Sequence, residues 1–433
     1  MKKLQHISLG VAVLALAACT KTQFDEFELN SGSADFSNYV SVGNSLTQGF
    51  QDNGVHNERG QQDNSFPAIL SQQMQLVNPS AKFKQPTVSG NGSGYIHLEW
   101  INEEIELVDV PAAGSWGATG DASWDVNTKY NNLGVSGIRL TDCVPTNGDL
   151  LSPTINQFIT SNNPMGGFLD WGSLFSPVSY LDHIKASSAT FFTCWLGNND
   201  VLGWATSGGD DGAITIPLIG SINLSEMTAV DVFSYKYDSV LTAFDRMGAK
   251  GVCATIPDVT SIPFFTTVTL DRVGDDVWIE EGPYSSTPGN VRLATKDDLL
   301  TLYASQDLGD GIGFTQANPI PHEDVLDRDE VVVSQTRTKE LNGEIKAMAA
   351  KHGFPVADMY EYMKELESGI TLDGVDYDAK YIEGGAFSLD GIHPNNRGYA
   401  LVANKFIEVI NQAYGSNIPP VIVANYSGIY FPN

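Results

Sequence analysis

The sequence is poor in basic residues and in cysteine. Its 433 residues include 24 lysines and arginines against 52 aspartates and glutamates, which gives a formal net charge of −28. A surface of this sign repels nucleic acid and anionic lipid headgroups, so we expect no nucleic-acid partner. Only four cysteines are present and no C-x-x-C occurs, which argues against a structural zinc site.

Several catalytic signatures are also missing. There is no G-x-S-x-G, so the nucleophile elbow of α/β-hydrolases is not supported. There is no H-E-x-x-H and no G-x-x-x-x-G-K-[ST], which argues against a zinc protease and a P-loop enzyme. We therefore expect neither a metal nor a cofactor.

The N-terminus has the pattern of an export signal. Two lysines precede the apolar stretch 7–18, which is too short to span a membrane comfortably and ends in Leu-Ala-Ala before Cys19. This junction resembles the lipobox of bacterial lipoproteins. The resemblance implies a signal peptide over 1–18, acylation of Cys19 and a lipidated tether over 19–36. We expect an exported protein anchored in the cell envelope at the outer membrane. Either the periplasmic face or the surface face of that membrane is compatible with the sequence.

The other three cysteines are Cys143, Cys194 and Cys253. An odd number cannot pair completely within the chain. Cys194 and Cys253 lie in apolar, strand-like runs, so we expect them to be buried as small hydrophobic side chains.

Beyond the tether, apolar strand-like runs alternate with helical periodicity, which favours an α/β fold with a parallel sheet. Strands are predicted at 39–42, near 132–133, and at 189–196, 251–256 and 355–359. Helices are predicted over about 66–77, 230–247, 329–352 and 400–413.

Three long stretches rich in glycine, asparagine, aspartate and proline separate these elements. They cover 85–128, 203–227 and 260–328. Segments of this length inside a compact domain are usually functional loops or contain structure of their own. We interpret them as insertions above one core, so that 37–433 forms a single domain.

A candidate nucleophile follows the first predicted strand. Ser45 lies in the sequence Gly-Asn-Ser-Leu-Thr-Gln-Gly over 43–49. Parallel sheets gather their ligands beyond the carboxyl ends of the strands, and the flanking glycines allow a tight turn. Alone this signal is weak, because a serine in such a loop is more often a helix cap.

A candidate base precedes the last predicted helix. Asp390 stands three residues before His393, and Pro394 stiffens the turn. An acid at this spacing can reach the imidazole, select its tautomer and stabilise the imidazolium. This pattern favours a catalytic pair over a structural histidine.

Two further motifs can supply hydrogen-bond donors. Gly137 ends the sequence Asn-Leu-Gly-Val-Ser-Gly over 132–137, and its backbone N–H is a candidate donor. Asn199 belongs to Gly-Asn-Asn-Asp over 197–200, after the third predicted strand. Each motif alone is also typical of an ordinary turn.

Together and in this order, the four motifs resemble the SGNH (GDSL) hydrolase family over about 38–414, apart from the insertions. The resemblance implies a flavodoxin-like three-layer α/β/α sandwich with a five-stranded parallel sheet in the order 2-1-3-4-5. One departure is Asn44, where the family usually has aspartate before the serine. Asparagine keeps the shape and can accept a hydrogen bond, so we expect an effect on loop anchoring rather than on catalysis.

The resemblance also implies the role of each site residue. Ser45 is the expected nucleophile, His393 the general base and Asp390 the residue that orients it. The expected oxyanion donors are the backbone N–H groups of Ser45 and Gly137 and the side chain of Asn199. We therefore predict hydrolysis of a carboxylic ester through an acyl-enzyme.

The sequence leaves several points open. A small ester, a lipid or an acylated glycan fits as substrate, and the oligomeric state is undetermined. One alternative is a non-catalytic glycan-binding lipoprotein, whose stacking residues would be Trp100, Trp116, Trp124, Trp171 and Trp204. A weaker alternative is a calcium-binding adhesin, suggested by Asp210, Asp211, Asp307 and Asp310. Five other histidines are interpreted as surface or core residues; they are His56, His97, His183, His322 and His352.

Overall fold

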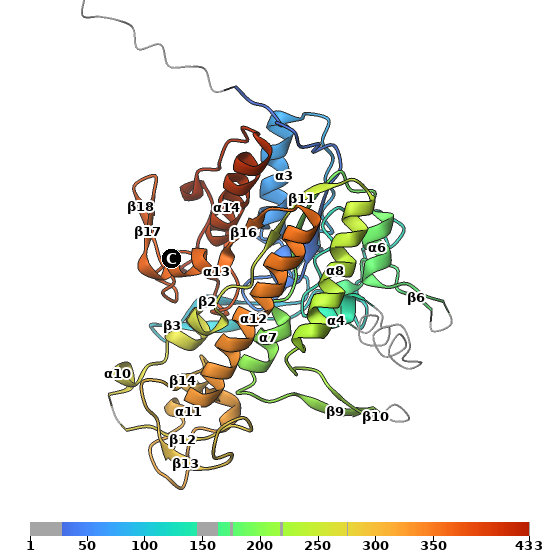
Figure 1. Cartoon of the computed structure of the whole chain (residues 1–433). Coiled ribbons are helices and arrows are strands. Elements are labelled where there is room, and N and C mark those ends of the chain that lie inside the picture. Colours follow the sequence, from blue (N-terminus) through green and yellow to red (C-terminus); the bar gives the residue numbers. More distant parts are fainter. Residues whose placement is uncertain (1–27, 145–162, 174–175, 217–219, 275, 433) are drawn as a thin grey trace, which may run out of the picture.

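A computed structural model describes most of the chain (Figure 1). The described residues are 28–144, 163–173, 176–216, 220–274 and 276–432. The predicted signal peptide, Cys19 and the first part of the predicted tether lie outside them.

Four parallel strands form the centre of the molecule (Figure 1). They are β1 (Tyr39–Gly43), β8 (Phe191–Trp195), β11 (Lys250–Ala254) and β16 (Val356–Ala357), in the order β1-β8-β11-β16. Every residue of β1 and β8 is buried. Apart from Ser41 and Thr193 their side chains are apolar, because a strand covered on both faces meets no water, and this explains why they were predictable as apolar runs.

The second of the five predicted strands, near 132–133, is wrong as a strand. This segment lies beside β1 through a single parallel bridge between Ser41 and Asn132. The Ser41 N–H donates to Asn131 O and the Leu133 N–H donates to Ser41 O, both at 2.9 Å. Side-chain amides of the two asparagines bind neighbouring carbonyls, and such bonds compete with a regular ladder. The segment therefore takes the position of the second strand in the predicted order without becoming one.

Helices cover both faces of the sheet (Figure 1). On one face α3 (Phe66–Val77) packs against α14 (Asn396–Tyr414). On the other face α8 (Val230–Arg246) packs against α6 (Tyr180–Ala186) and α12 (Arg328–His352). The four predicted helices are confirmed, and the three layers match the predicted architecture.

The ends of the longest helix follow from its sequence. The Asp327 side chain accepts hydrogen bonds from the N–H groups of Asp329 and Glu330 at the start of α12. Gly353 ends the helix at a φ of 73°, a conformation that glycine adopts without a steric penalty. Capping at both ends fixes the length of α12.

The predicted insertions contain local structure rather than open loops. Two antiparallel pairs lie in 85–128, namely β2 (Tyr95–Ile101) with β3 (Glu104–Val110) and β4 (Trp116–Gly117) with β5 (Gly120–Asp121). The pair β9 (Ala213–Ile216) and β10 (Gly220–Asn223) lies in 203–227. Two more pairs lie in 260–328, namely β12 (Trp278–Glu280) with β13 (Val291–Leu293) and β14 (Leu299–Leu300) with β15 (Val325–Leu326).

Further strand pairs and helices lie in the described part of the chain. The remaining strand pairs are β6 (Gly172–Ser173) with β7 (Ser176–Pro177) and β17 (Ile370–Leu372) with β18 (Val375–Tyr377). The remaining α-helices are α2 (Ser45–Gln48), α4 (Leu140–Cys143), α7 (Asn199–Ala205), α9 (Pro263–Thr266), α10 (Leu270–Val273), α11 (Ala304–Gly309) and α13 (Met359–Ser368).

The insertion 260–328 has a small apolar core of its own. Its buried members are Val277, Ile279, Leu300, Ala304, Ile320 and Val325. Arg292 binds the carboxylates of Glu281 and Asp298 beside it. The Phe264 N–H donates to Gly391 O at 2.9 Å, which ties the insertion to the segment before α14.

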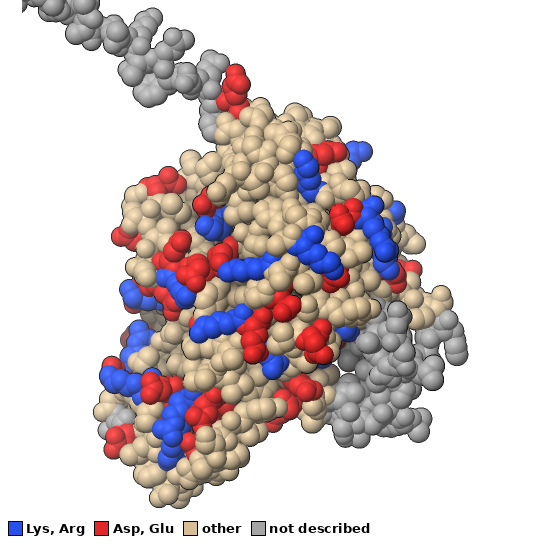
Figure 2. Space-filling view, viewed as in Figure 1, with Lys and Arg blue, Asp and Glu red and all other residues tan. Residues whose placement is uncertain are grey.

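Charges of both signs are interspersed over the face that carries α8 and α12 (Figure 2). Cys143, Cys194 and Cys253 are buried free thiols, which confirms the prediction for Cys194 and Cys253. Throughout the described ranges, each helix is too short or too polar to cross a bilayer.

Candidate active site

Ser45 is the first residue of α2, directly after β1. The Asn44 side chain caps this helix by accepting a hydrogen bond from the Leu46 N–H at 3.1 Å. Asparagine therefore still anchors the loop through an accepted hydrogen bond. Its amide nitrogen is buried without a partner among the residues that the structure describes.

The turn into α2 requires glycine at position 43. A Cβ at Gly43 would lie 2.0 Å from the Thr47 Oγ1 and 2.8 Å from the backbone oxygen of Trp195. No other side chain fits between β1, β8 and α2 without moving one of them. The glycine thereby lets the helix that begins with Ser45 approach the end of the sheet.

His393 joins Ser45 to Asp390. Its Nε2 lies 2.8 Å from the Ser45 Oγ, and its Nδ1 lies 2.9 Å from the Asp390 Oδ2. Ser45 and His393 are 6% and 8% exposed. The fold thus brings together three predicted side chains, from opposite ends of the described chain, in one continuous hydrogen-bonded series.

The environment of Asp390 favours its carboxylate form. Oδ1 accepts from the N–H groups of Ile392 and His393, both at 2.8 Å, and from the Ser388 hydroxyl at 3.0 Å. Oδ2 also accepts from the Asn53 N–H at 3.1 Å. Burial alone would raise the pKa of Asp390, but the charge of His393 and these hydrogen bonds outweigh it and hold the pKa below its ordinary value.

A second segment clamps the turn that carries Asp390. The Asp52 N–H donates to the Ser388 hydroxyl, and the Leu389 N–H donates to the Asp52 carboxylate, both at 3.0 Å. Asp52 has a φ of 53°, in the left-handed region that non-glycine residues rarely adopt. Neither Asp52 nor Ser388 was predictable as part of the site from the sequence. The sequence Asp52-Asn53-Gly54 is typical of a turn, but this local pattern does not reveal the contact with the turn that carries Asp390.

The Phe50 ring also contacts the histidine. Its centroid lies 4.5 Å from that of His393. This contact and the two ring hydrogen bonds restrict the orientation of the imidazole.

Two of the predicted oxyanion donors, Gly137 and Asn199, lie on adjoining segments, and the third is the backbone N–H of Ser45. Gly137 has a φ of 80°, and the neighbouring Ser136 N–H donates to the Gln48 side chain of α2 at 2.8 Å. The Asn199 Nδ2 donates to Ile138 O at 3.0 Å, so the structure brings Asn199 to the segment that carries Gly137. The amide retains a second hydrogen for another acceptor.

Asp200 holds these two segments together, a role that was not predicted from the sequence. Its buried carboxylate accepts from the Leu140 N–H at 2.9 Å and from the Thr228 hydroxyl at 2.5 Å. Burial raises the pKa of Asp200 to about 6. Its position after Asn199 in the 197–200 motif was a signal for a local role, but the partners are not evident from the sequence.

The sequence profile described as GDSL-like lipase/acylhydrolase matches residues 39–406. The chain belongs to this family. The match spans every motif from Ser45 to His393 and all three insertions, and it confirms the resemblance found in the sequence. Membership identifies the protein as an ester hydrolase of the SGNH type.

Several solved structures are similar to this member of the family at low sequence identity. An α/β hydrolase named LAE5 from the Lake Arreo metagenome is 12% identical, with 87% of this chain and 96% of that chain covered and a TM-score of 0.34. A lipase/acylhydrolase from Enterococcus faecalis is 12% identical, with 88% and 97% covered and a TM-score of 0.33. An extracellular lipase from Streptomyces rimosus is 14% identical, with 87% and 98% covered and a TM-score of 0.33. No curated protein matches the sequence.

The remaining histidines have other contacts. His56 stacks on Tyr95, His183 binds a backbone carbonyl, and the other three pair with carboxylates. These contacts agree with the surface and core interpretation.

The two alternatives to an enzyme gain no support. Among the tryptophans proposed for sugar stacking, Trp100 is 53% exposed, but Trp124, Trp171 and Trp204 are buried beneath the loops. In the described ranges, no group of three or more histidine, cysteine or acidic side chains can hold a metal ion. The Asp211 carboxylate instead accepts hydrogen bonds from the Tyr284 hydroxyl.

Proposed function

We propose that the chain hydrolyses carboxylic esters through an acyl-enzyme formed on Ser45. The Ser45 Oγ attacks the ester carbonyl while His393 Nε2 accepts its proton, and Asp390 stabilises the resulting imidazolium. The N–H groups of Ser45 and Gly137 and the free hydrogen of Asn199 Nδ2 donate to the oxyanion. His393 then returns the proton to the leaving alcohol.

A water molecule completes the reaction. His393 accepts one proton from the water as its oxygen attacks the acyl carbon. Collapse of the second tetrahedral intermediate releases the carboxylic acid and restores the Ser45 hydroxyl. The reaction consumes one ester and one water and needs no redox partner.

The observation that carries this proposal is the unbroken series from the Ser45 hydroxyl through both nitrogens of His393 to a carboxylate. A hydroxyl is a weak nucleophile unless a base lies within hydrogen-bond reach, and the 2.8 Å separation meets that requirement. The depressed pKa of Asp390 supports a charged partner for the imidazolium at neutral pH.

Replacement of the serine tests the proposal. We expect Ser45→Ala to lower kcat for p-nitrophenyl acetate by at least about 10⁴-fold and to abolish labelling by a fluorophosphonate probe. Ser71→Ala is the matched control, because Ser71 is also buried but its hydroxyl binds Ala68 O within α3. Wild-type turnover by Ser45→Ala, with the fold intact, would rule out this nucleophile.

We also propose that the protein is exported and acylated at Cys19. The basic start, the short apolar stretch 7–18 and the Leu-Ala-Ala-Cys junction support this. Cys19→Ala should move the protein from the detergent phase to the aqueous phase in Triton X-114 partitioning, with no acyl mass on the mature N-terminus. An unchanged partition would contradict the anchor.

A further inference from the structure

An apolar pocket lies next to the Ser45–His393 pair. It is lined by Leu46, which follows Ser45, and by Ile392 and Pro394, which flank His393. The space between the lining side chains, including its opening to solvent, measures about 580 Å³. Apolar linings of this kind suit an apolar part of a small organic ligand, and the lining includes the chain neighbours of both Ser45 and His393.

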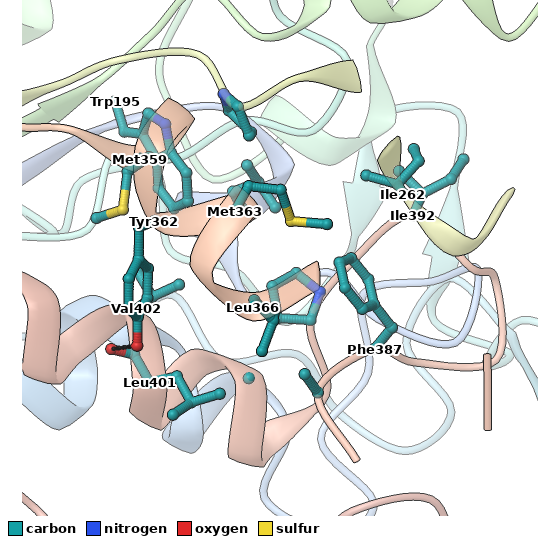
Figure 3. A pocket seen from close by; sticks show the side chains of 15 residues that line it. Trp195, Ile262, Met359, Tyr362, Met363, Leu366, Phe387, Ile392, Leu401 and Val402 are labelled. Carbon is teal, nitrogen blue, oxygen red and sulfur yellow. Dashed lines mark hydrogen bonds between the residues drawn. The ribbon is translucent and has the colours of Figure 1, made fainter. Parts of the chain in front are cut away.

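Helices α13 and α14 form much of the wall (Figure 3). Met359, Met363 and Leu366 contribute from α13, and Leu401 contributes from α14. These four residues are buried, so this wall of the pocket belongs to the apolar interior of the protein. Methionine side chains adapt to the shape of a flexible apolar ligand because they have three rotatable bonds.

Another part of the pocket wall comes from the insertion 260–328 and from the turn before α14. Ile262 and Ile392 line the pocket from these two segments. The hydrogen bond from Phe264 N–H to Gly391 O joins the segments next to them. The same turn therefore carries the base and closes the pocket.

The polar atoms on the lining side chains already have partners. The Trp195 Nε1 donates to Thr255 O at 3.0 Å, and the Tyr362 hydroxyl donates to Leu401 O at 3.4 Å. A sugar or a charged group placed here would lose its water without gaining hydrogen bonds, which is costly. An alkyl chain carries no such penalty.

We propose that this pocket binds the acyl chain of the substrate and makes the protein selective for esters of medium-length fatty acids. The inference rests on the proposed function, because the acyl group is attached to the Ser45 Oγ beside Leu46 throughout the intermediate. An alkyl chain that leaves water for this apolar lining is stabilised in proportion to the area that it buries.

The helix geometry sets the length of the chain that fits. Met359 and Leu366 both line the pocket and are seven residues apart on α13, which corresponds to about 10 Å. An extended alkyl chain advances about 1.3 Å per carbon, given tetrahedral C–C bonds of about 1.5 Å. About eight carbons therefore span the pocket.

A series of p-nitrophenyl esters from acetate to palmitate tests the inference with the full protein. Each buried methylene should raise kcat/KM by about fourfold, so we expect octanoate to exceed acetate by at least about 100-fold. Palmitate should fall below octanoate because its chain exceeds the pocket. Equal kcat/KM for acetate and octanoate would overturn the inference.

Two substitutions assign the selectivity to the pocket. Met363→Trp should reduce the octanoate-to-acetate ratio by at least about tenfold, because the indole fills the space of several methylenes. Leu366→Ala enlarges the pocket and should move the highest kcat/KM to esters with longer acyl chains. This variant provides the test if Met363→Trp does not fold. Leu76→Trp on α3, where Leu76 is 50% exposed, is the control and should leave the ratio unchanged. An unchanged ratio and optimum in both pocket variants would contradict the assignment.

The outcomes separate this inference from the proposed function. Activity on acetate that depends on Ser45 but not on chain length would leave the hydrolase in place and refute the acyl pocket. Absence of activity on every ester, acetate included, would refute the proposed function itself.

Discussion

Replacement of Asp390 by asparagine is the sharpest probe of the proposed proton path, because the change removes a charge and keeps the shape. An asparagine can turn its amide nitrogen to either oxygen position. At the Oδ1 position it would face the N–H groups of Ile392 and His393, and at the Oδ2 position it would face His393 Nδ1 and the Asn53 N–H. In the second orientation the amide can donate to Nδ1.

That donation changes the tautomer of the imidazole. A neutral imidazole that accepts at Nδ1 carries its proton on Nε2, which then cannot accept the proton of Ser45. The imidazolium of the transition state also loses its charged partner. We expect kcat/KM of Asp390→Asn to fall by about 10⁴-fold, which corresponds to ~5 kcal/mol in activation free energy.

The assay is kcat/KM for a p-nitrophenyl ester at neutral pH, with circular dichroism to verify folding. Asp238→Asn is the matched control. Asp238 accepts a hydrogen bond from the His352 Nε2 at 2.8 Å where α8 meets α12, in a second aspartate–histidine pair that has no contact with Ser45. We expect that variant to keep its activity. Activity of folded Asp390→Asn within threefold of wild type would refute this reasoning.

Two further changes test the framework around the site. Because the pKa of Asp200 is raised to about 6, its protonated form favours folding at low pH, and this stabilisation is lost as the pH rises from about 4 to about 6. An uncharged Asp200→Asn side chain can accept from the Leu140 N–H through its oxygen and donate to the Thr228 hydroxyl through its amide nitrogen. The melting temperature of this variant relative to wild type should therefore rise over that pH interval, and a pH-independent difference would contradict the raised pKa. Arg292→Met should leave the Glu281 and Asp298 carboxylates unpaired and destabilise the insertion by about 3–5 kcal/mol, seen as faster proteolysis within 260–328. Equal cleavage rates would show that this ion network is dispensable.

The sequence was most informative where one local pattern determines one structure. The apolar runs that became β1 and β8 were predictable because a strand covered on both faces has no polar side. The end of α12 was predictable from the glycine that follows it. The strand predicted near 132–133 failed because asparagine side chains compete for backbone partners, and their choice depends on segments that are distant in sequence.

Motifs in the sequence were sufficient to select Ser45, Asp390 and His393, which the fold joins by hydrogen bonds, and the spacing of Asp390 and His393 is short and local. Tertiary structure alone determined the rest. It placed Ser45 within hydrogen-bond reach of His393, connected Asp52 to the acid turn and set Asp200 between the donor segments. It also formed an apolar pocket from α13, α14 and an insertion. Such contacts join residues far apart in the chain, and their geometry depends on the packing of the whole core rather than on any local pattern.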